Sequence, residues 1–102
     1  MPQHDFTQLY AQYPAVLDQL PGRFSSHEFI LQLAQQHQAL YVEALYSYRN
    51  TIHRGKAAPF QIVHAILAMR LTNCTDRIRQ LSPINSQNIF GESVECAAWE
   101  KI

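Results

Sequence analysis

The sequence predicts an all-α fold, a small bundle of four to six helices around one long central helix at about residues 26–50. Two observations lead to this prediction. The 102 residues are 47% hydrophobic and 16% charged, which suits a single packed helical domain over residues 1–102. All five prolines and all three glycines fall between segments of helical periodicity, so the breakers agree with the hydrophobic pattern.

The predicted central helix begins with a complete capping signal. Ser25 is placed as the N-cap and Glu28 as the third helical residue, so each side chain can bond the other residue's backbone N–H. Phe24 and Phe29 stand at the two positions of a hydrophobic staple. Because neither proline nor glycine occurs from residue 26 to residue 50, the sequence contains nothing that would interrupt this helix.

This helix is predicted to be apolar on two sides. In the middle of the main stripe lies His37, which we interpret as a core histidine with one hydrogen bond, or one that reaches the edge of the helix, rather than as a general base. A second strip, roughly opposite, contains Leu31, Ala39, Val42 and Tyr46. Either the fold covers this strip or a partner chain does, so Leu31, Val42 and Tyr46 are the candidate protein-contact residues.

The remaining elements are predicted from caps and periodicity. Residues 84–91 are expected to form a loop, and a strand over residues 96–102 is a weaker alternative to a last helix, since the alternation is poor. The expected helices are 6–20, as two short helices or one kinked helix, then 59–71, 76–81 and 94–102.

The net charge of zero hides an uneven distribution. Residues 49–79 contain six Lys and Arg residues and one acidic residue, whereas both flanking segments are net acidic. The basic middle could bind nucleic acid, or it could neutralise the acidic ends within the fold.

Residues 60–81 have the layout of a helix-turn-helix, and this layout is the basis for an alternative DNA-binding function. The second helix of the pair would present Arg77, Arg79 and Gln80 to base edges. Arg49, Arg54 and Lys56 would contact phosphates beside it.

Catalytic, metal and cofactor sites are not predicted. No two histidines or cysteines have ligand spacing, so His53, His64 and Cys74 could converge only through the fold. No glycine-rich loop is available to hold a phosphate group. The two cysteines suggest reduced thiols in a cytoplasmic protein, and no apolar run is long enough to span a membrane.

Taken together, these observations favour a non-enzymatic binding or regulatory module without a cofactor. It is expected to contact another protein or a second copy of itself. The alternative is a small DNA-binding regulator that uses residues 60–81.

Overall fold

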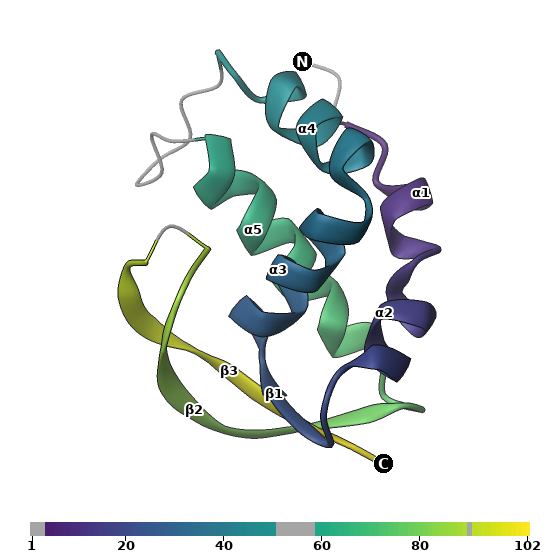
Figure 1. Ribbon diagram of the computed structural model, residues 1–102, viewed down its shortest axis with the longest axis vertical. Helices are drawn as coiled ribbons and strands as arrows, with labels where there is room; N and C mark the ends of the chain where they lie inside the picture. Colours follow the sequence, from purple (N-terminus) through teal and green to yellow (C-terminus); the bar gives the residue numbers. More distant parts are fainter. Residues whose placement is uncertain (1–3, 51–58, 90) are drawn as a thin grey trace.

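The structure is a computed structural model, and it describes residues 4–50, 59–89 and 91–102. The chain forms a layer of helices packed on a small antiparallel sheet, which Figure 1 shows at the lower end of the molecule. The predicted all-α bundle is therefore wrong, and the fold is α+β. The helices are α1 (Thr7–Tyr10), α2 (Tyr13–Gln19), α3 (Ser26–Gln36), α4 (Gln38–Ser47) and α5 (Pro59–Arg70), followed by the 3₁₀ turn η1 (Leu71–Asn73).

The sheet has three strands, β1 (Arg23–Ser25), β2 (Ile78–Gln87) and β3 (Ser93–Lys101), in the order β1-β3-β2. Both pairings are antiparallel, and Trp99 of β3 lies between Phe24 of β1 and Gln80 of β2. The register of β2 against β3 shifts between Leu81 and Ile84, the two residues that flank Ser82 and Pro83. Proline is tolerated there because β2 is an edge strand and needs no N–H bond on its outer side.

Two predicted helices, 76–81 and 94–102, are strands, and β2 also covers much of the predicted loop at 84–91. The hydrophobic pattern does not identify β3 as a strand, because both faces of the strand are buried at Ala98 and Trp99. Adjacent residues of a strand point to opposite faces, yet Ala98 and Trp99 are both buried. The two-residue alternation that identifies a half-exposed strand is therefore absent. The weaker alternative, a strand over 96–102, is correct in type.

A hairpin turn joins β2 to β3. Gly91 adopts a φ of 82°, a left-handed conformation that glycine adopts at little cost. Its N–H donates to the carbonyl of Asn88, and the Asn88 N–H donates to the carbonyl of Glu92. The Asn88 side-chain oxygen also accepts from the Glu92 N–H at 3.1 Å. This turn fixes where the acidic end of the hairpin lies.

The capping box at the start of α3 is confirmed. The Glu28 N–H donates to Ser25 Oγ at 3.1 Å, and the Ser25 N–H donates to the Glu28 carboxylate at 3.3 Å. Ser25 is also the last residue of β1, so the cap joins a strand directly to a helix. Phe24 and Phe29 are both buried in the core.

The predicted central helix is broken at His37, which ends α3 and begins α4 with a non-helical φ of −131° and ψ of 54°. The break redirects the chain. α3 packs against α2, α5, β1 and β3, whereas α4 packs against α1 and α5. Tyr41, Ala44 and Tyr48 of α4 are buried in this way. Tertiary packing has overridden a local sequence that permits a continuous helix.

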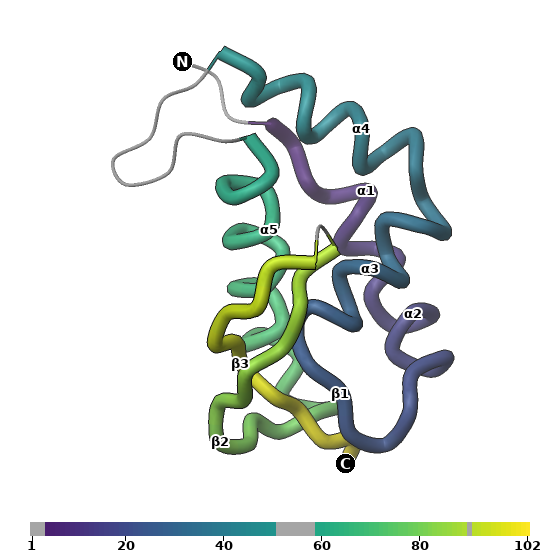
Figure 2. Tube along the Cα trace, turned by 60° about the vertical axis from the view of Figure 1, so that its left-hand side comes forward, coloured from purple at the N-terminus to yellow at the C-terminus, as the bar shows by residue number. Residues whose placement is uncertain are grey.

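The core is one cluster that connects both layers. Tyr13 donates its hydroxyl to the carbonyl of Leu67 at 2.6 Å, which joins α2 to α5, and burial raises the pKa of that hydroxyl. Figure 2 shows α3 lying between α2 and the strands, consistent with its contacts to both. The predicted short helices in residues 6–20 and the helix from Pro59 are confirmed. α3 therefore contacts both α5 and the sheet.

Candidate binding groove

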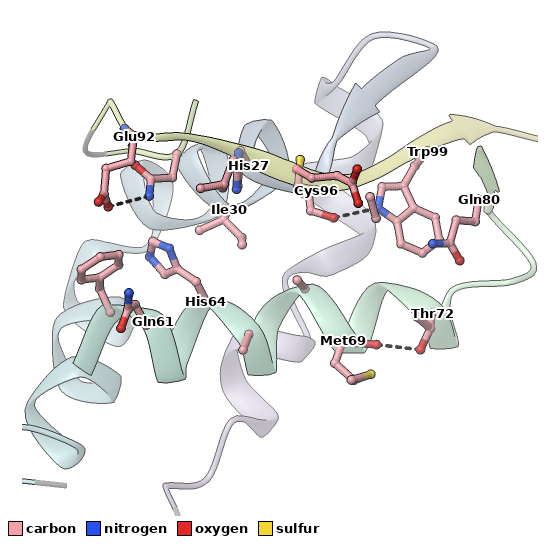
Figure 3. A pocket seen from close by; sticks show the side chains of 18 residues that line it. His27, Ile30, Gln61, His64, Met69, Thr72, Gln80, Glu92, Cys96 and Trp99 are labelled. Atoms are coloured by element: carbon pink, nitrogen blue, oxygen red, sulfur yellow. Dashed lines mark hydrogen bonds between the residues drawn. The ribbon is translucent and has the colours of Figure 1, made fainter. Parts of the chain in front are cut away.

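A groove of about 630 Å³ lies between α5 and the β2–β3 hairpin, with the first residues of α3 at its base. Figure 3 shows His64 and Met69 on the helix side, and Glu92, Cys96 and Trp99 on the strand side. Its volume falls within the range of roughly 300–1,000 Å³ that is usual for ligand sites in proteins. We call this feature the α5–hairpin groove.

The base of the groove is anchored by Trp99. Its side chain is 3% exposed, and its indole Nε1–H donates to Ser26 Oγ at 2.9 Å. Ile30, one turn further along α3, lines the groove and is also buried. The bond between Trp99 and Ser26 fixes β3 against the start of α3, so the base is rigid and largely apolar.

The helical wall is formed by one side of α5. Ala65 and Ala68 have small side chains, so the groove can extend close to the helix backbone. Met69 lines the same side and is 69% exposed, a high value for a large apolar side chain. Across the groove Val94 is 47% exposed. Two large apolar groups thus remain in contact with water at the same concave surface.

His64 lies in the helical wall and is half-buried. Its Nε2 is 2.5 Å from the hydroxyl of Tyr41, and the Tyr41 hydroxyl donates in the tautomer that leaves Nε2 unprotonated. Burial, followed by the nearby His27, lowers the pKa of His64 to about 4. Burial also raises the pKa of Tyr41. Both side chains are therefore neutral near pH 7, and the pair contains no anionic nucleophile.

His27 lies at the N-terminal end of α3 and lines the groove as well. Its Nδ1 is buried and has no hydrogen-bond partner among residues 4–50, 59–89 and 91–102. Burial lowers the pKa of His27, although the nearby backbone of Ser86 and Gln87 offsets part of the shift. Because Nδ1 is covered by the protein itself, it is not a contact point for a bound group.

The strand side of the groove is acidic. Glu92 and Glu95 both line it, and both are exposed. The Asn88 side-chain amide donates to the Glu92 carboxylate at 3.1 Å, which holds that group at the end of the hairpin. No Lys or Arg occurs among the described residues that line the groove.

The predicted protein-contact residues lie elsewhere, on the outer side of the helices. Leu31 of α3 is 38% exposed, and Val42 and Tyr46, one turn apart on α4, are 59% and 62% exposed. Their role as contact residues stays a prediction. The break at His37 places Leu31 on a different helix axis from the other two, so the strip is not the continuous line that the sequence predicts.

The helix-turn-helix layout at residues 60–81 is wrong, because Arg79 and Gln80 lie in β2 and Arg77 lies in the turn before it. Gln80 lines the groove instead. Arg79 donates to the Glu100 carboxylate at 3.1 Å. The guanidinium of Arg49 lies 3.8 Å from the ring centre of Tyr46. Predicted phosphate contacts at Arg54 and Lys56 lie outside the described residues.

The described residues include no group of three His, Cys, Asp or Glu side chains that could hold a metal ion. Cys74 and Cys96 are free thiols, and burial raises the pKa of Cys74, which makes its thiolate scarcer. In the part of the chain that the structure covers, none of the helices has the length and apolar character needed to cross a bilayer.

No protein family, curated protein or solved structure matches this chain. The geometry of the groove is therefore the basis for assigning a function. Sequence reasoning missed this site because its strand side lies in segments that were predicted as loop and helix. Asn88 and Gly91, with Glu92 beside them, were the available signal, since such residues are typical of a turn between two strands.

Proposed function

We propose that this chain is a non-enzymatic module that binds a segment of another polypeptide in the α5–hairpin groove. The observation that supports this most directly is the groove itself, a concave surface with a rigid apolar base and two exposed apolar side chains, Met69 and Val94. A surface of this kind suits the insertion of apolar side chains from a partner.

An enzymatic function is less well supported. His64 has a pKa of about 4 because of burial, so it is a weak base at neutral pH. Its neighbour Tyr41 is held neutral by burial, and the Cys74 thiol has a raised pKa. A cytoplasmic location is part of the proposal and is supported by the two unpaired cysteines.

DNA binding is the second candidate, and one observation favours it. The described part of residues 49–79 holds Arg49, Arg70, Arg77 and Arg79 against one acidic residue, Asp76. The exposed residues of α5 include Gln61 and Met69, and the guanidinium of Arg70 lies over the ring of Tyr10. With Glu92 also at the groove, this surface offers little attraction for phosphates.

The test begins with a display library of random short peptides screened against the purified protein. Peptides that bind are then mapped by chemical-shift changes in labelled protein. We expect the changes to cluster at the groove, and Ala65→Trp, which fills it, to weaken binding by at least about tenfold. Ala39→Trp, the same change at an exposed position of α4, is the matched control and should leave the affinity unchanged.

Two results would contradict the proposal. One is peptide binding that Ala65→Trp does not affect. The other is salt-dependent binding of duplex DNA with shifts at α5 and β2, which would put the DNA-binding candidate first.

A further inference from the structure

We infer that the partner segment is cationic, with a Lys or Arg next to the apolar side chain that enters the groove. This inference depends on the proposed function, because it specifies the partner of the same site. Its basis is the charge and the apolar character of the described residues that line the groove.

The two ends of β3 treat their carboxylates differently. Glu100 accepts from Arg79 at 3.1 Å and lies 3.8 Å from the Arg23 guanidinium, and these partners stand opposite it on β2 and β1. Glu92 and Glu95 lie at the other end. Neither has a Lys, Arg or His within ion-pair distance among the described residues. Of the described carboxylates only Glu100 is in an ion pair, and Glu92 and Glu95 are the two carboxylates that line the groove.

These two carboxylates are positioned to face a ligand. Glu95 lines the groove together with its neighbours on β3, Val94, Cys96, Ala97 and Trp99. Glu92 is held by Asn88 at the end of the hairpin, across from Gln61 of α5 in Figure 3. The negative charge is therefore fixed beside the apolar base.

The histidines do not neutralise this charge. Burial lowers the pKa of both His27 and His64, so both are uncharged near pH 7. The described lining then carries two negative charges and no positive charge, next to the exposed Met69 and Val94. A segment that combines an apolar side chain with a cation complements both properties, whereas a nucleic acid would be repelled.

The experiment uses the same random peptide library, sorted by the net charge of the peptides that bind. We expect enrichment of Lys and Arg next to apolar residues. The double variant Glu92→Gln with Glu95→Gln should weaken these peptides about three- to tenfold at low salt, as expected for two exposed charge pairs. The effect should shrink as salt is added. The side-chain oxygen of glutamine at position 92 can still accept the hydrogen bond from the Asn88 amide. Circular dichroism of the double variant checks that the fold is retained.

The matched control is Glu43→Gln on α4, an exposed carboxylate that does not line the groove. It should leave peptide affinity unchanged. Peptides that bind in the groove without a preference for cations, or that bind the double variant normally, would overturn this inference and leave the proposed function standing. If no peptide maps to the groove, both fail. A dimer that forms through the groove and is lost in Ala65→Trp would replace the separate cationic partner with a second copy of the chain.

Discussion

The α5–hairpin groove and the outer face of α4 both expose large apolar side chains, but the groove is a concave surface with a buried tryptophan at its base. On α4, Val42 and Tyr46 point away from the body of the molecule, and Arg49 lies over the Tyr46 ring. At the groove, Met69 and Val94 accompany a buried tryptophan and two carboxylates that have no ion pair within the described part of the chain. The comparison shows that exposed apolar area alone does not identify a binding site.

The largest difference between the two regions should be in stability. Trp99→Ala removes a buried side chain and leaves Ser26 Oγ without the indole N–H, so we expect the free energy of unfolding to fall by roughly 3–5 kcal/mol. Tyr46→Ala, an exposed aromatic on α4, should change it by within about 0.5 kcal/mol. Chemical denaturation of both variants measures the two values. Equal losses would mean that Trp99 does not support the base of the groove.

The helical half of the molecule could be predicted from the sequence because its signals are local. The capping box at Ser25 and Glu28 uses residues three positions apart, and Pro59 marks the start of α5 correctly. The break at His37 has no such signal, since it results from packing of α4 against α1 and α5. A pattern read along one helix cannot register contacts with helices that are distant in the sequence.

The sheet could not be predicted for the same physical reason. β1 is three residues long and pairs with β3, more than 70 positions away, so nothing near Phe24 identifies it as a strand. Arg79 was assigned to a reading helix on the basis of charge, yet it lies on β2 and pairs with Glu100. This pair is consistent with the other interpretation of the basic middle, in which it neutralises an acidic end of the chain. The groove could not be predicted from the sequence, because residues of both β2 and β3 line it and neither strand was the favoured prediction.

An intermediate effect should appear in the pH dependence of stability. Folding lowers the pKa of His64 from its usual 6.5 to about 4. Above pH 6.5 the residue is neutral in both states, and its contribution to stability is fully present. Between pH 6.5 and 4 the unfolded chain takes up a proton that the folded chain does not, so stability falls as the pH falls. For this half-buried group we expect a loss of roughly 1–2 kcal/mol.

His64→Gln isolates this contribution, because glutamine retains hydrogen-bonding groups but does not titrate. The measurement is the free energy of unfolding of the variant and the unmodified protein at a series of pH values from 7 to 5. The free energy of unfolding of the variant should change less steeply with pH than that of the unmodified protein. His27 also has a lowered pKa, so some slope should remain. Parallel curves would show that His64 is not protected from protonation in the folded protein.

The smallest effect is expected at the α4 face, from Tyr46→Glu. Tyr46 is 62% exposed, so a charge at this position stays in contact with water. The free energy of unfolding should therefore change by no more than about 0.5 kcal/mol. If the groove is the binding site, the variant should also bind groove peptides with unchanged affinity. Sedimentation of both proteins over a range of concentrations then tests the original prediction for this strip. A dimer in the unmodified protein that Tyr46→Glu converts to a folded monomer would make the α4 face an interface, since a buried carboxylate opposes association. That result, together with unchanged peptide binding, would show that the two surfaces serve separate contacts, whereas loss of peptide binding in Tyr46→Glu would reverse the ranking of the two regions.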